Sequence, residues 1–236
     1  FQDKVFMETL TNTLFYLIQI PIMILFALIL ATILNKPNLR CKGFFRTCIF
    51  LPCATSLVSY SLVFKSLFAA DGLINLVLLN TGIFSVPYDF LGHPMSAKII
   101  IIVAMVWRWT GYNMVFYLSG LQNIEHSVYE AAKIDGCSWY GVFFRIIVPM
   151  IVPSLVTVAV LTFMSSWEDF MGALLYLNKP ETYTVAYALK MFNDSSMSDY
   201  GATFAMSAAS LVPILVLFFF FQKNLVEGIS IQGLKG

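Results

Sequence analysis

The feature of this sequence that most limits its fold is a series of long apolar stretches. The first runs from Leu10 to Leu34 without a single charged side chain. A helix needs about 20 mostly apolar residues to cross the hydrocarbon core of a bilayer. Charged residues make up 11% of the chain, whereas a soluble domain has about a quarter. We therefore predict an all-α membrane protein.

Four further stretches are predicted to span the membrane, which gives five spans in this chain. They run from Thr47 to Phe64, from Ile99 to Leu121, from Ile146 to Trp167 and from Tyr200 to Phe221. Interior prolines are compatible with such spans because neighbouring helices satisfy the freed backbone groups. Two shorter apolar stretches, 73–79 and 172–177, are followed by turn residues and are predicted to be interfacial or re-entrant segments.

The basic residues predict how the chain is oriented in the membrane. Lys36, Arg40, Lys42 and Arg46 form the strongest basic cluster, and they follow the first span. Short loops rich in Lys and Arg stay in the cytoplasm. We therefore expect the N-terminus of this chain outside, and the loop 122–145 and the C-terminus inside.

The cysteines and histidines give no pattern for a metal site. The four cysteines form no CxxC pair and have no histidine close in sequence, so we expect free thiols and no bound metal. His93 and His126 are expected to be loop residues. The sequence has no GxxxxGK[ST] motif, so this chain has no phosphate-binding loop of that kind. No cofactor is expected on it.

Two short helices joined by a turn are predicted between the third and fourth spans. Ser127 and Glu130 have the spacing of a capping box, in which the Ser side chain caps the helix and the Glu side chain reaches back. Gly136 suits the left-handed position that ends a helix. Ser138 is placed to cap a second helix that begins at Trp139. The alternative is an ordinary surface helix in which Glu130 does nothing beyond capping.

This loop also resembles the EAA loop of ABC importer permeases. The pattern E-A-A-x3-G-x9-I-x-L-P matches from Glu130 to Pro149 at every fixed position except one, where Val148 replaces Leu. The resemblance implies that the loop, at about 124–149, is the coupling helix that docks into a separate cytoplasmic ATPase. It assigns this contact to Glu130, Ala131, Ala132, Asp135 and Gly136, with the two alanines exposing backbone for close approach.

The resemblance to carbohydrate-uptake permeases extends over essentially the whole chain. The segments Gly43–Arg46 and Gly72–Asn75 are similar to the larger maltose-transporter permease and the glycerol-phosphate permease. Ser166–Phe170 and the tail 222–236 are similar to the second subunit type instead. The subunit type and the sugar therefore stay open.

The resemblance implies a type I ABC importer permease bundle that forms one transmembrane domain over 1–236. Family members usually have one more helix before this segment, so we expect a first helix to be absent from this chain. The implied partners are a homologous second permease, two ATPase subunits that bind ATP and Mg, and an extracellular solute-binding protein. The implied location is the cytoplasmic membrane of a bacterium or archaeon. No basic stripe suggests nucleic acid.

Four residues are candidates for contact with a sugar on its path through the membrane. Polar and charged side chains in spans are costly and usually face a cavity or a partner. Arg108 and Asn113 lie in the third span, and Trp167 and Glu168 lie at the outer end of the fourth. The alternatives are structural: an ion pair or snorkelling for Arg108, an interfacial anchor for Trp167 and a solvated loop edge for Glu168.

Other functions are weighed against half of a sugar-import pathway. One is an importer of another small polar solute, such as glycerol phosphate. A membrane-embedded enzyme would need paired carboxylates or His-rich motifs in its spans, and a stand-alone ion-coupled carrier would need more helices and an internal repeat. We find none of these features, so we expect no catalytic residues in this chain.

Overall fold

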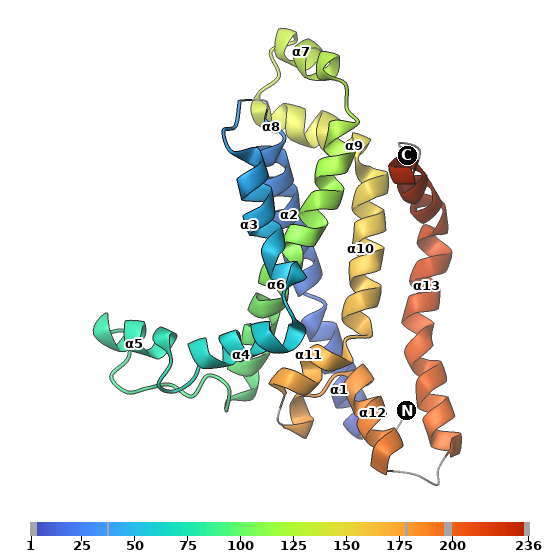
Figure 1. Cartoon of the computed structure of the whole chain (residues 1–236). Helices are drawn as coiled ribbons and strands as arrows, with labels where there is room; N and C mark the ends of the chain where they lie inside the picture. The colour runs from blue at the N-terminus through green and yellow to red at the C-terminus, as the bar shows by residue number, and fades with distance from the viewer. Residues whose placement is uncertain (1–3, 37, 178, 196–199, 234–236) are drawn as a thin grey trace. The chain divides into compact units, whose positions relative to one another are not determined.

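The computed structural model describes residues 4–36, 38–177, 179–195 and 200–233, and all regular elements in these ranges are helices (Figure 1). The chain divides into two compact units. Unit 1 contains residues 1–19, 54–107 and 163–214, and unit 2 contains residues 20–53, 108–162 and 215–236. The helices are α1 (Lys4–Tyr16), α2 (Gln19–Leu34), α3 (Lys42–Ala54), α4 (Leu57–Leu67), α5 (Leu73–Asn80), α6 (Pro94–Gln122), α7 (His126–Ile134), α8 (Trp139–Val142), the π-helix η1 (Phe143–Ile147), α9 (Val148–Met150), α10 (Val152–Trp167), α11 (Phe170–Tyr176), the 3-10 helix η2 (Pro180–Thr182), α12 (Val185–Ser195) and α13 (Tyr200–Gly233).

Span-length apolar helices confirm the predicted class of an all-α membrane protein. Three helices in the described residues are long and apolar enough to cross a bilayer: Phe6–Leu34, Pro94–Gln122 and Thr203–Val226. The pairs Lys42–Ala54 with Leu57–Leu67 and Tyr140–Met150 with Val152–Trp167 are each bent at a short break, and counting each pair as one span gives up to five. Every predicted span therefore overlaps one of these elements, and the number five stays a prediction.

Prolines mark several of the places where the apolar stretches are interrupted. The first stretch is two helices, because α1 ends at Tyr16 and α2 begins at Gln19. Pro21 accounts for this break, since a proline ring clashes with the carbonyl four residues earlier and lacks an N–H. In the fourth stretch a bend of 70° separates Tyr140–Met150 from Val152–Trp167, between Pro149 and Pro153. Pro213 instead lies inside the continuous helix α13.

The two short apolar stretches form helices that are too short to span a bilayer. Helix α5 has 8 residues and α11 has 7, and an α-helix rises only about 1.5 Å per residue. Asn75 accounts for how the α5 region folds. Its buried amide nitrogen donates to the carbonyls of Ala69 and Tyr88, and its oxygen accepts from the Tyr88 N–H at 2.9 Å. One polar side chain thus closes the loop on both sides of α5.

In unit 1 a second buried amide connects three segments. Asn12 of α1 donates to the carbonyls of Glu181 and Tyr183 at 2.8 and 3.1 Å, and accepts from Lys98 Nζ at 2.5 Å. Lys98 also lies 5.8 Å from the ring centroid of Phe15. Every polar atom of the buried Asn12 side chain is thereby used, as a low-dielectric interior requires.

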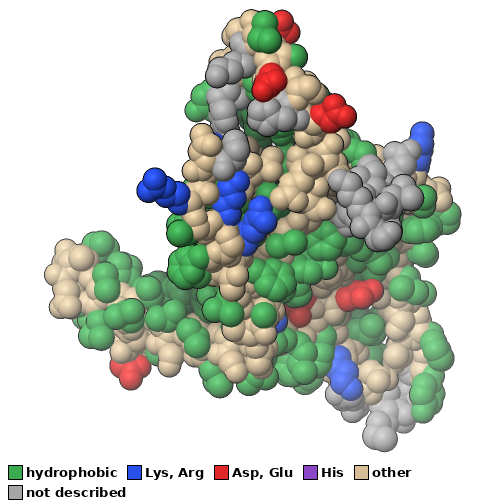
Figure 2. All heavy atoms as spheres, turned by 45° about the horizontal axis from the view of Figure 1, so that its top comes forward, with side chains coloured by type: hydrophobic (Ala, Val, Ile, Leu, Met, Phe, Trp, Pro, Cys, Tyr) green, Lys and Arg blue, Asp and Glu red, His purple; other side chains and the backbone are tan. Residues whose placement is uncertain are grey.

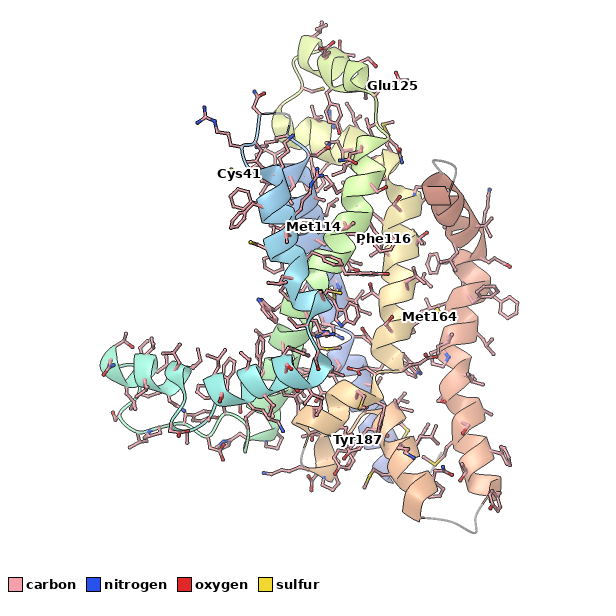
Figure 3. The ribbon with its side chains drawn as sticks, in the orientation of Figure 1. Cys41, Met114, Phe116, Glu125, Met164 and Tyr187 are labelled. Carbon is pink, nitrogen blue, oxygen red and sulfur yellow. The ribbon has the colours of Figure 1, made fainter. Side chains whose placement is uncertain are left out.

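The core of unit 2 is an apolar cluster between α2, α6 and the segment 143–158. Ala27 and Ala31 of α2 are fully buried, and such small side chains let membrane helices approach closely. Met114 and Tyr117 of α6 are likewise fully buried in this cluster, and Met114 is labelled in Figure 3. Hydrophobic side chains also cover much of the outer surface (Figure 2), as expected of a chain whose solvent is partly lipid.

The contact between α6 and α3 in unit 2 is made backbone to backbone. A Cβ atom added to Gly111 would lie 2.0 Å from the carbonyl oxygen of Ile49 and 3.0 Å from Cα of Phe50. These neighbours are main-chain atoms, so no side chain can rotate away to make room. Gly111 is therefore required for α3 and α6 to approach this closely.

We predict that Gly111→Ala destabilises the protein by about 1–3 kcal/mol, the usual cost of overpacking. Thermal unfolding in detergent should show a lower Tm. Gly43→Ala is the matched control, because Gly43 lies in α3 and its added Cβ would meet no atom within 4 Å. Equal Tm values for the two variants would contradict the backbone contact.

Candidate functional site: the loop 124–149 and the buried polar side chains

The first helix of the loop starts one residue earlier than the capping box requires. Helix α7 begins at His126, so Ser127 lies inside it and not at its N-cap. The Ser127 hydroxyl donates to the carboxylate of Glu125 at 3.2 Å. The predicted capping box is therefore wrong at Ser127, because the helix begins at His126 and an N-cap residue must precede the first helical residue. The same shift places His126 in a helix and not in a loop, whereas His93 does lie in the loop before α6.

The end of α7 and the start of α8 follow the prediction. Gly136 has φ of +69°, and the N–H of Cys137 donates to the carbonyl of Ala132 at 3.0 Å. This six-to-one bond with a left-handed glycine is the Schellman motif. Ser138 then accepts from the N–H of Gly141 at 3.2 Å and so caps α8. Hydrogen bonds between neighbours fix the turn between the two helices.

Helix α7 has an inner and an outer face. Val128 and Tyr129 pack against the apolar core of unit 2. Burial raises the pKa of the Tyr129 hydroxyl, and a hydrogen bond with Asn35 at the end of α2 lowers it in part. Figure 1 shows α7 beside α8, beyond the end of α6, and Glu125 is labelled before α7 in Figure 3. These inner contacts hold the helix on unit 2.

The outer face of α7 carries four of the five predicted contact residues. Glu130, Ala131, Asp135 and Gly136 are exposed. Ala132 is not, because its side chain is only 3% exposed. The expectation that both alanines present their backbone is therefore wrong for Ala132, which lies four residues after Val128 and so on the inner face.

Three large apolar side chains in this loop were missed by the sequence reasoning. Ile134, Tyr140 and Phe144 are 85%, 70% and 63% exposed. Isolated exposed apolar side chains are common on proteins, but these three occur within one loop that also carries Glu130 and Asp135. The available signal was the helical spacing, since Ile134 lies four residues after Glu130 and therefore on the same face.

The polar candidates of the third predicted span are buried in unit 2. The guanidinium of Arg108 lies 5.5 Å from the ring centroid of Trp109, a cation–π distance. Asn113 is 2% exposed, and its amide nitrogen has no hydrogen-bond partner among the described residues. Arg108 and Asn113 are five residues apart, so they lie on different faces of α6.

The candidates of the fourth span lie in unit 1 beside a cavity of about 480 Å³. Trp167 is 4% exposed, stacks on Phe163 with 5.7 Å between centroids, and donates its indole N–H to the Ser210 carbonyl at 3.0 Å. It therefore connects α10 to α13. Glu168 is exposed. The polar residues that line the cavity are Trp167, Glu168, Lys190, Asn193, Thr203, Ser207 and Ser210.

The described residues contain no group of three or more His, Cys, Asp or Glu side chains that could hold a metal ion. All four cysteines are free.

The fold and the site together define a helical protein with several membrane-crossing segments. Two short helices joined by a turn form a loop that is exposed on its surface. Residues 20–231 match the family described as "Binding-protein-dependent transport system inner membrane component". The chain belongs to this family. The match confirms the predicted class of ABC importer permease, and it confirms the prediction of a transport component and not an enzyme. It is accordingly a multi-pass protein of the inner membrane.

Curated relatives include permeases whose names refer to sugars. The chain is 55% identical over 152 residues to the "Lactose transport system permease protein LacF" of Rhizobium radiobacter, over 64% of this chain and 51% of that protein. It is 29% identical over 212 residues to the "Trehalose/maltose transport system permease protein MalF" of Thermococcus litoralis, over 88% and 70%. The chain thus spans about half the length of the lactose relative.

A solved structure confirms the fold. The crystal structure of a bacterial ABC transporter involved in the import of the acidic polysaccharide alginate matches with a TM-score of 0.83 and 22% identity. The match covers 96% of this chain and 80% of that chain. A second crystal structure, of a bacterial alginate ABC transporter in complex with an alginate pentasaccharide-bound periplasmic protein, matches with a TM-score of 0.81 and 23% identity. This match covers 93% of this chain and 77% of that chain.

Proposed function

We propose that this chain is a permease subunit of an ATP-driven ABC importer and forms half of the translocation pathway for a sugar or oligosaccharide. The observation that carries the proposal is the outer face of α7. Its residues match the EAA pattern, and the Schellman turn at Gly136 and the cap at Ser138 hold them in a fixed shape. A rigid, exposed element of this kind is suited to docking against another protein.

The outer face of α7 combines apolar and acidic side chains that could bind in a groove on the ATPase. Ile134 supplies an apolar side chain whose full burial is worth about 1.5–3 kcal/mol. Glu130 lies four residues before it and Asp135 directly follows it in the sequence, and charge-assisted hydrogen bonds to these carboxylates would fix the register. Closure of the ATPase pair on ATP and Mg would then move α7, and through Val128 and Tyr129 the core of unit 2 with it.

The other partners of the proposed importer follow from its family and relatives. A homologous second permease would complete the pathway, two ATPase subunits would drive it, and a binding protein would deliver the solute. The complex of an alginate transporter with a periplasmic protein supports the last of these. The relatives named for lactose and for trehalose and maltose favour a carbohydrate over glycerol phosphate.

The proposed sugar path uses the buried polar side chains of each unit. In unit 2 the amide nitrogen of Asn113 is a buried donor without an acceptor among the described residues. A sugar hydroxyl could accept a hydrogen bond from it. In unit 1 Glu168 and the other polar residues around the cavity offer hydrogen-bond donors and acceptors, and they include one negative and one positive side chain, Glu168 and Lys190. Trp167 contributes the cavity wall while its indole N–H holds α13.

We predict that Glu130→Gln lowers substrate-stimulated ATP hydrolysis about tenfold, because a lost charge-assisted hydrogen bond costs about 1.5–3 kcal/mol. Glutamine keeps the shape of the side chain, so abundance in the membrane should not change. Glu125→Gln is the control, since Glu125 is an exposed carboxylate just before the same helix. If Glu130→Gln and Ile134→Ser both retained full coupling, α7 would not be the docking element.

We predict that Glu168→Gln raises the KM for sugar transport several-fold, because the carboxylate at the cavity can accept two hydrogen bonds from sugar hydroxyls. Transport should be measured in vesicles with sugar-loaded binding protein. Glu181→Gln is the comparison, since Glu181 is also exposed in unit 1 but does not line the cavity. An unchanged KM would assign Glu168 to a solvated loop edge.

We also propose that the N-terminus of this chain lies outside and that α7 and the C-terminus lie in the cytoplasm. The cysteines at positions 41 and 137 are exposed on the protein and would both face the cytoplasm. A membrane-impermeant thiol reagent should label neither in intact cells and both after permeabilisation. Labelling of Cys137 from outside would reverse the orientation.

A further inference from the structure

The segment 36–46 carries a concentration of positive charge without an acidic residue near it in the sequence. The sequence has no acidic residue between Glu8 and Asp71. Four of the five basic residues in that interval are Lys36, Arg40, Lys42 and Arg46. None of these four forms an ion pair or a side-chain hydrogen bond within the described part of the chain.

The local backbone brings two of these cations onto one face of a helix. Cys41 adopts φ of +57°, the sole non-glycine residue in the described ranges with positive φ, and it turns the chain into α3 (labelled in Figure 3). Lys42 and Arg46 follow at a spacing of four residues in α3, so they lie on one face and repel each other. The Nε atom of Arg46 is buried and has no hydrogen-bond acceptor among the described residues.

Exposed aromatic rings lie between the cations. Phe44 is 68% and Phe45 44% exposed, and their rings meet edge to face with centroids 5.9 Å apart. Figure 2 shows basic side chains gathered beside hydrophobic ones on one face of the molecule. A cytoplasmic surface in contact with water would not favour exposed rings at the start of a helix, whereas the acyl boundary of a bilayer accepts them.

We propose that residues 36 and 38–46 form a binding site for anionic phospholipid headgroups. The four cations would hold the phosphates through charge-assisted hydrogen bonds from their terminal nitrogens. The rings of Phe44 and Phe45 would enter the acyl region below the phosphates. The bilayer is the favoured occupant because the segment joins the span-length helix ending at Leu34 to the apolar helix α3, which places it at the membrane surface.

The test is native mass spectrometry of the full chain in detergent, titrated with a phosphatidylglycerol and separately with a phosphatidylcholine. The wild type should retain phosphatidylglycerol in preference to phosphatidylcholine. A variant carrying Lys36→Gln, Arg40→Gln, Lys42→Gln and Arg46→Gln should lose this preference at least about tenfold, since each basic residue near an anionic surface contributes about 1 kcal/mol. The charge-preserving control carries Lys36→Arg, Arg40→Lys, Lys42→Arg and Arg46→Lys, and should keep most of the preference.

Raising the salt concentration tests the same site without a substitution, in case the neutralised variant fails to fold. Phosphatidylglycerol retention by the wild type should fall between about 50 mM and about 500 mM salt, because screening weakens the contact, while phosphatidylcholine retention should not. Equal phosphatidylglycerol retention by the wild type and the neutralised variant, or a salt-independent preference, would overturn the proposal. So would a neutralised variant that keeps the lipid but loses the ATPase, which would assign the cations to a protein partner.

Discussion

The absence of water in the hydrocarbon core of a bilayer is the constraint on which the rest of this structure depends. Each backbone N–H and C=O there needs a partner within the protein, so the apolar stretches form helices. Where side chains inside these helices are polar, several donate to the helix itself. Thr13, Thr32 and Thr157 each donate to the carbonyl four residues earlier at 2.8–2.9 Å, and Thr13 also accepts from the N–H of Val185.

The same constraint explains why breaks and glycines are confined to particular places. Three of the five unit boundaries, at residues 19–20, 53–54 and 214–215, lie within two residues of Pro21, Pro52 or Pro213. Interrupted helices need neighbours that satisfy the freed carbonyls, and close helix packing supplies them. Gly111 is one consequence, since α3 and α6 touch through main-chain atoms there.

Much of the fold and part of the site could be predicted because they depend on local rules. The spans follow from hydropathy, and the turn at Gly136 and the cap at Ser138 follow from backbone conformation and side-chain chemistry over a few residues. What failed depends on tertiary contacts or on the residue at which a helix begins. Ser127 is not the N-cap because α7 begins one residue earlier, at His126. Ala132 is buried because α7 turns that face toward the core of unit 2. The exposure of Ile134 follows from the same orientation, which no pattern in a single sequence fixes.

The central claim is that the outer face of α7 docks into an ATPase, and Cys137 provides a direct probe of it. This exposed thiol directly follows Gly136 in the turn between α7 and α8. The measurement is the rate of maleimide labelling of Cys137 in inside-out vesicles, with Cys48 and Cys53 replaced by serine and with or without saturating ATPase. The exposed Cys41, which precedes α3, is kept as an internal reference. Docking predicts that the ATPase slows labelling of Cys137 several-fold and leaves that of Cys41 unchanged, whereas an equal rate at Cys137 with and without the ATPase would contradict the account.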